Sequence, residues 1–351
     1  MKFDIDKYLL AVNSKGRQAL MKINEIAIAN VAIFIIDENK KLLGSITDGD
    51  IRRGLLQGKN IDDGVSEFMN MNSKFLIEDA DNYLRVKEYK SMGVRFIPVV
   101  DLDKIIITLF DLEKIKSILP LDAIIMAGGR GERLKPLTDN VPKPMLKIGD
   151  KPIIIRNLER LISFGIKNFH VTVRYLGDKI ISGIEETKNE NCNYSYVKED
   201  KPLGTIGAVK LVESIKNNSI LLMNSDLLTN INFEEFYDFF IASNSDMVVA
   251  TIPYHIDVPY AVMDINEKQE VQSFKEKPRY TYFSNAGIYL FKKDLLDLIP
   301  SNESFDATHF MEAVISKKLK LSSYPILDYW LDIGRIEDFH KAQEDVKHIM
   351  F

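Results

Sequence analysis

Residues 122–138 read DAIIMAGGRGERLKPLT, so a short apolar run passes directly into a glycine-rich turn. The run Asp122–Ala127 is rich in aliphatic side chains and is bounded by a turn signal, which predicts a buried β-strand. A glycine-rich turn after the first strand of an α/β domain commonly binds phosphate, because backbone amides without side chains around them can approach an anion closely. We therefore expect an anion site at this turn.

Three prolines narrow down the kind of phosphate loop. A P-loop would end in Gly-Lys-Ser/Thr, and the sequence does not contain that triplet. A dinucleotide-binding turn would pass at once into a helix, which Pro136, Pro142 and Pro144 prevent. What remains is a long extended loop that presents Arg133 and Lys143, ten residues apart. A guanidinium fork and an ammonium point charge both suit a triphosphate.

The segments around this loop follow the pattern of an α/β domain. From Leu121 to Phe351, apolar strand candidates alternate with helical stretches, which indicates βαβ units. Later strand candidates follow one another without long helices between them, so some antiparallel pairing is expected. We predict a Rossmann-like, mixed but mostly parallel sheet with helices on both faces. The strand candidates are Asp122–Ala127, Asn168–Val173, Ile220–Met223, Met247–Thr251, Ala261–Asp264, Val271–Phe274 and Ala286–Phe291, and the helix candidates are Ile153–Phe164, Thr205–Ser214 and Phe233–Ala242.

Two aspartates outside the loop are candidate metal ligands. Asp226 ends the apolar run LLMNSD, where α/β sheets place ligand groups, and Asp332 lies in WLDIG. Mg²⁺ prefers hard oxygen ligands and is commonly held by one or two carboxylates together with substrate phosphates. Either aspartate taken alone could instead be a helix cap.

The order of short motifs over residues 121–351 resembles the sugar-nucleotidyltransferase, or nucleotide-sugar pyrophosphorylase, family. Along the chain these motifs are GGRGER, PKP, PLGT, NSD, EKP and WLDIG. The resemblance implies that Arg133 helps to stabilise departing pyrophosphate and that Lys143 bridges both substrates. It also assigns Asp226 and Asp332 to Mg²⁺. Glu132 departs from the family, in which many members carry Thr or Ser. The loop that the resemblance places around the triphosphate consists of Ala127, Gly128, Gly129 and Gly131.

The same resemblance assigns the two substrate ends of the site. It places Gly204 of the PLGT motif against the base and Glu199 at the pairing edge of the base. It gives Glu276 the sugar hydroxyls and Lys277 the sugar phosphate. A plain helix start at PLGT and an ordinary charged turn at EKP remain the alternatives. The further residues on the sugar side are Asn285 and Gly287.

The residues that the implied reaction needs are cationic rather than nucleophilic. A sugar 1-phosphate is already an anion at pH 7, because the second pKa of a phosphate monoester is about 6. Attack on the nucleotide α-phosphate demands in-line positioning and neutralisation of negative charge. Arg133, Lys143, Lys277 and Mg²⁺ would provide that neutralisation. The sequence therefore predicts a nucleotidyltransferase, and a non-catalytic nucleotide-sensing protein is the alternative from a different class.

Glu199 also bears on the choice of base. Guanine offers two neighbouring donors, N1–H and the N2 amine, and one carboxylate can accept both, whereas uracil, thymine and adenine are mismatched there. We therefore expect a preference for GTP, unless Glu199 is a solvated acid in a charged run. A whole-chain resemblance to guanylyltransferases of nonulosonate (legionaminic acid) biosynthesis implies glucosamine 1-phosphate as the sugar substrate. The alternatives are mannose 1-phosphate with GTP, and uridylyl or thymidylyl transfer.

The first part of the chain contains a weak internal repeat. One copy reads VAIFIIDENKKLLGSITDGDIRRGL from Val31, and the other reads VRFIPVVDLDKIIITLFDLEKIKSI from Val94. Each copy predicts two strands followed by a helix that begins after Thr-x-x-Asp. Either copy alone would expose an apolar sheet face, so we expect the two to pack together.

This repeat resembles a CBS pair, a module that often binds adenine nucleotides. We expect its two motifs at about 1–60 and 61–118, followed by the nucleotidyltransferase domain at 121–351. The resemblance implies a regulatory nucleotide and a homo-oligomer assembled through the pair. Ile105 of the second copy stands where the first has Gly44. The residues implied for the ligand are Thr47, Asp50, Thr108 and Asp111.

Composition and charge exclude several other classes. The 46 Lys and Arg against 51 Asp and Glu give a net charge of -5, which predicts neither a nucleic-acid partner nor a membrane surface. No apolar run approaches the ~18 residues of a spanning helix, and the opening residues MKFDIDKYLL lack the pattern of a signal peptide. Cys192 is the single cysteine, so we expect no internal disulfide. These features predict a cytoplasmic protein.

Overall fold

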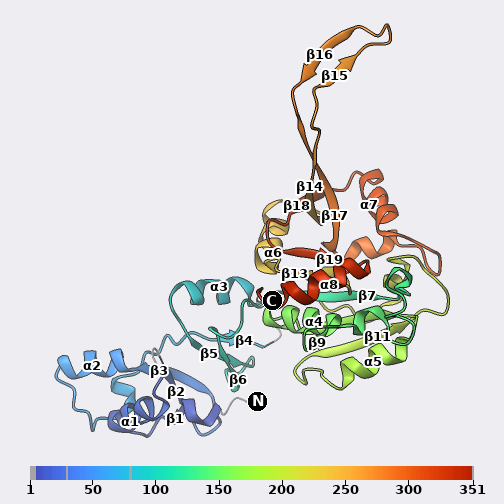
Figure 1. Ribbon diagram of the computed structural model, residues 1–351. Coiled ribbons are helices and arrows are strands. Elements are labelled where there is room, and N and C mark those ends of the chain that lie inside the picture. The colour runs from blue at the N-terminus through green and yellow to red at the C-terminus, as the bar shows by residue number, and fades with distance from the viewer. Residues whose placement is uncertain (1–4, 29–30, 79–80, 350–351) are drawn as a thin grey trace. The chain divides into compact units, whose positions relative to one another are not determined.

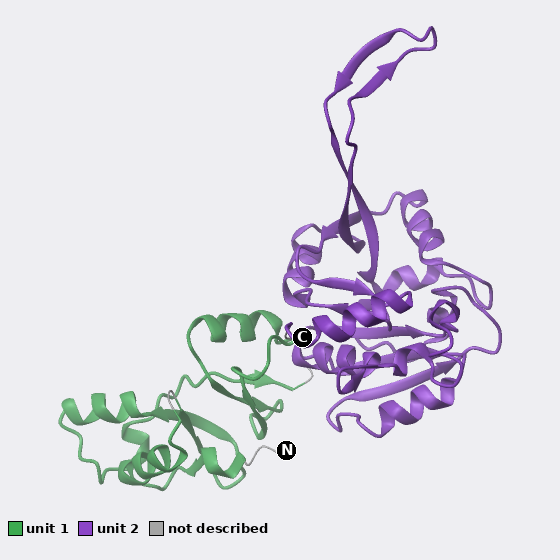
Figure 2. Ribbon diagram, in the orientation of Figure 1, with its two compact units in different colours: residues 1–118 green, residues 119–351 purple. Residues whose placement is uncertain are grey.

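The computed structural model describes residues 5–28, 31–78 and 81–349. The chain forms two compact units, Met1–Ile118 and Leu119–Phe351 (Figure 2). Within the described ranges, no helix combines the length and the apolar character that crossing a bilayer requires.

The first unit consists of two halves with the same strand topology. In each half the first strand runs parallel to the second, and the second pairs antiparallel with the third. The predicted internal repeat is thus present as a repeated three-stranded sheet. The first half contains β1 (Leu9–Ala11), α1 (Gly16–Ile26), β2 (Ala32–Ile36), β3 (Leu42–Thr47) and α2 (Asp48–Leu56). The second half contains β4 (Leu76–Ile77), α3 (Tyr83–Ser91), β5 (Phe96–Val100) and β6 (Ile106–Asp111).

The two halves differ after their third strand. Thr47 caps α2 in the first half, as the Thr-x-x-Asp pattern predicts. The helix predicted after Asp111 in the second half is wrong, because residues 112–120 form only turns and extended chain. The ammonium of Lys90 binds the carbonyl oxygens of Ile115 and Lys116 at 2.7 and 2.6 Å, which holds this segment open. Pro120 also leaves too few residues for a stable helix.

The second unit is built on a seven-stranded mixed sheet with the order β11-β10-β7-β12-β17-β14-β18 (Figure 1). The first four strands in this order are mutually parallel, and β17 runs antiparallel to both of its neighbours. This topology confirms the predicted mixed, mostly parallel sheet. The strands are β7 (Leu121–Ala127), β10 (Asn168–Val173), β11 (Asn193–Lys198), β12 (Ser219–Asn224), β14 (Met247–Asp257), β17 (Arg279–Lys292) and β18 (Leu321–Pro325). The helices are α4 (Ile153–Ser163), α5 (Gly177–Glu185), α6 (Phe233–Ala242), α7 (Ala307–Ser316) and α8 (Ile336–Asp345).

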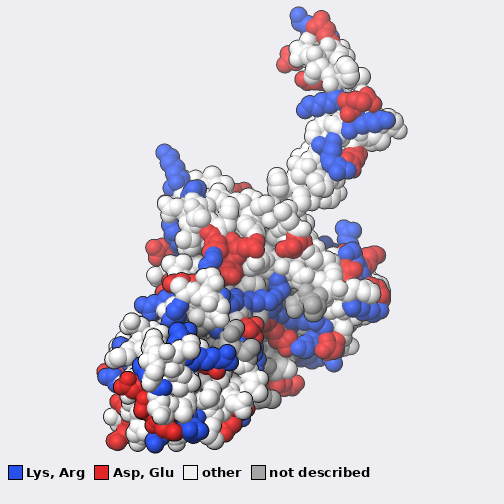
Figure 3. Space-filling view, turned by 90° about the vertical axis from the view of Figure 1, so that its left-hand side faces the viewer, with Lys and Arg blue, Asp and Glu red and all other residues white. Residues whose placement is uncertain are grey.

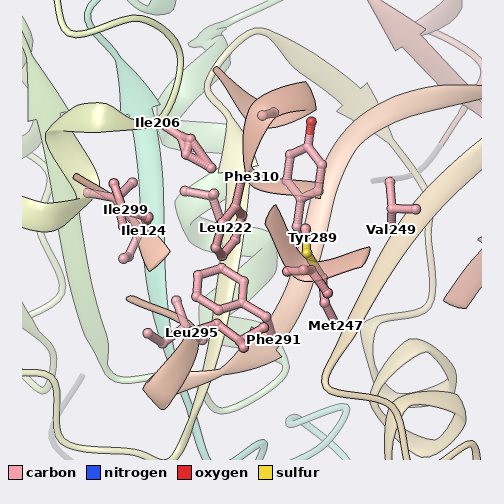
Figure 4. Packing of buried hydrophobic residues seen from close by; sticks show 14 of the residues in the cluster. Ile124, Ile206, Leu222, Met247, Val249, Tyr289, Phe291, Leu295, Ile299 and Phe310 are labelled. Carbon is pink, nitrogen blue, oxygen red and sulfur yellow. The ribbon is translucent and has the colours of Figure 1, made fainter. Parts of the chain in front are cut away.

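A large apolar cluster lies against one face of the central strands (Figure 4). Ile124 of β7 and Leu222 of β12 are fully buried there, and Phe291 of β17 meets Phe310 of α7 edge to face at 5.2 Å between ring centroids. Ile125, the neighbour of Ile124 on the opposite face, is also fully buried. Burial on both faces explains why these strands read as continuous apolar runs. It also fixes the ends of β7 and β12 in place.

One helix prediction in this unit is wrong. Residues 205–214 form only a short 3-10 helix, Gly207–Leu211, where an α-helix was expected. The backbone N–H groups of Ile206 and Gly207 both donate to the carbonyl oxygen of Phe305, at 3.0 and 3.1 Å. A Cβ at Gly207 would lie 2.6 Å from the carbonyl oxygen of Glu303, so this segment is held by the loop before α7. The helices predicted at Ile153–Phe164 and Phe233–Ala242 are confirmed as α4 and α6.

The strands β14 and β17 continue beyond the sheet as a two-stranded arm, residues 252–284 (Figure 1). The end of the arm is formed by β15 (Val262–Ile265) and β16 (Val271–Lys275), which pair antiparallel. The predicted antiparallel pairing of the later strands is therefore confirmed. Acidic and basic side chains of the arm are interspersed along its surface (Figure 3).

Candidate active site

A cavity of about 390 Å³ opens at the carboxyl ends of the four parallel strands. Gly128 and Gly129 follow β7, Glu199 follows β11, and Asp226 follows β12. Ligand sites of open α/β sheets lie at this edge, because the loops there are free to present side chains and amides. The structure thus gathers these residues, predicted from separate motifs, around one cavity, together with Gly204 and Lys143.

The glycine-rich loop is extended and folds back on itself, as its prolines predict. Two short 3-10 helices, Glu132–Leu134 and Lys143–Met145, are its only helical turns before α4. Gly131 has φ 64°, and a Cβ there would lie 3.0 Å from the Cβ of Lys143. The hydroxyl of Thr138 donates to the carbonyl oxygen of Gly131 at 2.9 Å and closes the loop. Glycine at 131 therefore lets Lys143 return to the start of the loop.

Lys143 lies between the two predicted metal ligands. Its ammonium forms an ion pair with Asp226 and lies 3.8 Å from Oδ1 of Asp332. A small antiparallel ladder explains this convergence: β13 (Leu227–Thr229) pairs with β19 (Trp330–Asp332), with Leu227 directly opposite Asp332. Asp226, one residue before the ladder, and Asp332, its last residue, therefore meet.

Burial and the neighbouring charges of this cluster shift the pKa of Asp332. Burial raises the pKa of its carboxyl group, and the neighbouring carboxylate of Asp226 raises it further, while Lys143 and Arg133 oppose the increase. Arg133 lies close by, since a Cβ at Gly334 would be 3.6 Å from its guanidinium. Two carboxylates and two cations thus share one small volume, which suits a charged ligand.

The donor set fits Mg²⁺. Oδ1 of Asp226 and Oδ1 of Asp332 are both buried and have no hydrogen-bond partner within the described ranges. A buried carboxylate oxygen without a partner is costly, so each is poised to accept a cation. No group of three or more His, Cys, Asp or Glu side chains that could hold a metal occurs in the described part of the chain. Two carboxylates completed by substrate phosphates are the arrangement that Mg²⁺ tolerates.

The base end of the cavity is formed by Glu199 and the turn that follows. The carboxylate of Glu199 accepts the backbone N–H of Leu203 at 3.4 Å, and a Cβ at Gly128 would lie only 2.5 Å from its Oε1. Burial raises the pKa of Glu199, and the hydrogen bond from Leu203 and the charge of Arg174 oppose the increase. Gly204 has φ 74° and packs on the carbonyl oxygen of Phe305. Glu199 is thus a half-buried acceptor facing the glycine loop.

The predicted sugar-side residues separate into two groups. Asn285 and Gly287 lie where the arm joins the sheet, and a Cβ at Gly287 would lie 2.5 Å from Nδ2 of Asn224, which lines the cavity. Glu276 and Lys277 are exposed, lie on the arm between β16 and β17, and do not line the cavity. None of the four lines the cavity: Gly287 packs against Asn224, which does, whereas Glu276 and Lys277 lie on the arm.

The lining of the cavity includes charged and amide side chains that were not among the predicted site residues. Arg174 directly follows β10, Asn224 ends β12, and Asp306 precedes α7 and accepts the backbone N–H of Thr205 at 2.8 Å. The rule that placed Asp226 at a strand end applies equally to Arg174 and Asn224. Asp306 has no such signal, because tertiary packing brings it beside Thr205.

A second cavity, of about 800 Å³, lies in the first unit. Its lining includes Thr47 and the cationic side chains Arg52, Lys74 and Arg95. Asp50 does not line it, since its carboxylate accepts the backbone N–H of Thr47 at 2.8 Å in a helix-capping box. The other two predicted ligand residues, Thr108 and Asp111, do not line the cavity either.

The sequence model of the family described as Nucleotidyl transferase matches residues 122–348. The chain belongs to this family. The glycine loop, both aspartates and the whole active-site cavity of this nucleotidyltransferase-family chain lie within the matched region.

Three relatives of this chain are identical to it at 27–31% of the aligned residues. A mannose-1-phosphate guanyltransferase of Saccharomyces cerevisiae is 31% identical over 230 residues, which cover 62% of this chain and 63% of that protein. A mannose-1-phosphate guanylyltransferase of Mycobacterium tuberculosis is 27% identical over 231 residues, 64% of each chain. The crystal structure of HddC from Yersinia pseudotuberculosis is 28% identical, with a TM-score of 0.51, covering 64% of this chain and 99% of that one. The alignment thus spans just under two thirds of the length of these curated relatives.

Proposed function

We propose that this chain transfers a nucleoside monophosphate from a nucleoside triphosphate to a sugar 1-phosphate. The observation that carries the proposal is the pair of buried Oδ1 atoms on Asp226 and Asp332 that have no hydrogen-bond partner, next to Lys143 and a glycine-rich phosphate loop. An oxygen of the sugar phosphate attacks the α-phosphorus and forms a new P–O bond. The bond from the α-phosphorus to the bridging oxygen breaks, and pyrophosphate leaves with both electrons.

The protein's part in this reaction is positioning and charge neutralisation. Gly129 borders open space, so its backbone can approach a phosphate, and Lys143 can reach the negative charge that builds up around the α-phosphate. Arg133, near Asp332, is placed to neutralise departing pyrophosphate. Mg²⁺ held by Asp226 and Asp332 would supply further charge neutralisation. The nucleophile is already ionised at neutral pH, so no side chain has to remove a proton.

We further propose GTP as the donor. Glu199 supports this choice, because a half-buried carboxylate matches the two adjacent donors of guanine, and both curated relatives above are named as guanylyltransferases. Two acceptors remain candidates. The names of those relatives favour mannose 1-phosphate, and the whole-chain resemblance of the sequence favours glucosamine 1-phosphate. Pyrophosphate release measured with four nucleoside triphosphates against a panel of sugar 1-phosphates tests the proposal, which fails if no pair reacts.

The contribution of the EKP motif depends on the position of the arm. Contact of Glu276 and Lys277 with the sugar would need the arm in a position other than the one observed. We propose that Asn285 and Gly287 form the sugar end of the site, which the packing of Gly287 against the cavity residue Asn224 supports.

Glu199→Gln is expected to weaken GTP use by roughly ten- to hundredfold and to improve UTP or dTTP use relative to GTP. The amide keeps the shape but replaces one acceptor with a donor, which leaves a guanine donor mismatched. Asp200→Asn, at the exposed neighbouring acid, is the matched control and should leave the ratio unchanged. Equal ratios of GTP to UTP turnover in wild type and Glu199→Gln would exclude the direct contact.

For the first unit we propose a CBS-type regulatory site that takes a nucleotide in the 800 Å³ cavity. Arg52, Lys74 and Arg95 support this proposal because they outnumber Asp48, the one acid of the lining, which pairs with Arg52 at 2.8 Å, and so give the cavity net positive charge. Arg52→Ala in the full chain should lower nucleotide affinity about tenfold, since each charge-assisted hydrogen bond contributes about 1.5–3 kcal/mol. Arg53→Ala is the matched control, because Arg53 points to Asp50 and does not line the cavity. Calorimetric titration with AMP, ATP and GTP measures the effect, and absence of heat at millimolar ligand would contradict the site.

A further inference from the structure

The end of the arm has one apolar face that nothing in the described structure covers. In the antiparallel pair β15–β16, Met263 lies opposite Phe274, and Ile265 lies opposite Val271. These four side chains are 48%, 65%, 50% and 58% exposed. Met263 and Ile265 stand two residues apart on β15, so they share one face, and their partners Phe274 and Val271 lie on the same face because a register shift skips Gln272. The intervening pair Asp264 and Ser273 lies on the other face. The ribbon is thus amphipathic, although both faces are open to solvent.

An amphipathic ribbon of this kind is not stable by itself. A two-stranded hairpin is marginal in water unless its apolar face packs on something, and free strand edges invite further pairing. No third strand pairs with β15 or β16 in the part of the chain that the structure describes. An exposed cluster of large apolar side chains commonly marks an interaction surface. We therefore expect the apolar face of β15–β16 to pack against a partner.

The stem of the arm prevents the chain from covering this face itself. Strands β14 and β17 stay paired without a break from Thr251 and Asn285 outward. On one side the stem is fastened by a hydrogen bond between His255 and Thr281 at 3.0 Å, and next to it by the ion pair of Asp257 and Arg279 at 2.6 Å. Bending the stem itself would break these pairs. The paired stem therefore holds the end of the arm away from the seven-stranded sheet, where its apolar face is open to another molecule.

Charge along the arm indicates what that molecule is. The turn at residues 264–270 carries three acids and one lysine, and the segment 275–279 carries three cations and one glutamate. Two copies of the arm laid antiparallel would place the acidic turn of one beside the cationic segment of the other. A two-fold axis then passes near residues 271–274, where Val271 and Phe274 lie in the apolar face. A self-complementary patch of this kind is what a two-fold dimer requires.

We propose that the apolar face of β15–β16 packs against the same face of a second copy of this chain. The interface is a two-fold pairing of arms, with Met263, Ile265, Val271 and Phe274 at its centre and opposite charges at its two ends. It is independent of the reaction at the active site.

The mass of the full chain in solution tests the pairing. Phe274→Glu places a charge in the centre of the face and should halve the mass measured by light scattering at tens of micromolar protein. Ser273→Glu, one residue along on the opposite face, is the matched control and should keep the wild-type mass. A monomeric wild type, or an unchanged mass in Phe274→Glu, would overturn the proposal.

A cross-link keeps the test independent of folding defects in the glutamate variant. In a Cys192→Ser background, Phe274→Cys should form a disulfide-linked dimer under mild oxidation, because position 274 lies near its counterpart across the two-fold axis. Ser273→Cys should stay unlinked. Equal cross-linking of both variants, or of neither, would contradict a pairing through this face.

Discussion

Asp226→Asn and Asp332→Asn are each expected to lower pyrophosphate release by about 100-fold or more while the protein stays folded. Each substitution keeps the shape of the side chain and removes a negative charge from the proposed Mg²⁺ site, where electrostatic stabilisation of the transition state is concentrated. Both carboxylates have a buried oxygen with no hydrogen-bond partner, so the folded state loses no hydrogen bond at that atom. Steady-state turnover with saturating Mg²⁺, together with thermal unfolding, measures the effect.

The matched control for this pair is Asp297→Asn. Asp297 is an exposed aspartate of the same unit that pairs with Lys210 at 3.2 Å and does not line the cavity. Its substitution should change turnover by less than about twofold, because exposed ion pairs contribute little. Near-normal turnover in both active-site variants would show that the two aspartates do not hold the metal.

Lys143→Met is expected to lower turnover by about 100-fold or more and also to destabilise the metal-free protein. The ammonium of Lys143 is the cation that separates the carboxylates of Asp226 and Asp332 when no metal is present. Without it, the two carboxylates repel one another, and the pKa of Asp332, which Lys143 holds down, rises further. We expect the metal-free variant to lose about 1–3 kcal/mol of unfolding free energy, the range for a buried polar group left without its partner.

Thermal unfolding with and without Mg²⁺ separates this effect from catalysis. Adding Mg²⁺ should stabilise Lys143→Met more than wild type, because the metal then replaces the missing cation. Lys151→Met is the control, since Lys151 forms an exposed pair with Glu159 away from the cavity. Identical stabilisation of wild type and Lys143→Met by Mg²⁺ would mean that Lys143 does not balance the two carboxylates.

Much of the site follows from local sequence. Pro136, Pro142 and Pro144 are too closely spaced for a continuous helix, so the extended phosphate loop needed no tertiary information. Glu199 directly follows β11 and Asp226 stands two residues after the apolar strand β12, and the carboxyl ends of parallel strands meet at one edge of a sheet. The register of β7, β10, β11 and β12 then brings their ends around one cavity.

Other features depended on contacts between segments far apart in the chain. The stretch after Thr205 has the composition of a helix start, yet hydrogen bonds to Phe305 hold it as a short 3-10 turn. The stretch after Asp111 repeats the pattern of the first copy, yet Lys90 binds the carbonyl groups of this stretch, which does not form a helix. In both cases, a tertiary hydrogen bond outweighs a local propensity of only a few tenths of a kcal/mol per residue.

The sequence by itself thus determined the α/β class, the phosphate loop and the carboxylates that follow it, because chain stereochemistry and strand periodicity act over a few residues. Tertiary structure alone decided that Lys143 separates Asp226 from Asp332, that Asp306 joins the cavity, and that the EKP motif lies outside it on the arm. Each of these depends on how paired strands such as β13–β19 and β14–β17 continue beyond the motif. A three-residue pattern carries no information on where its strand leads, since that direction is set by partners distant in the chain.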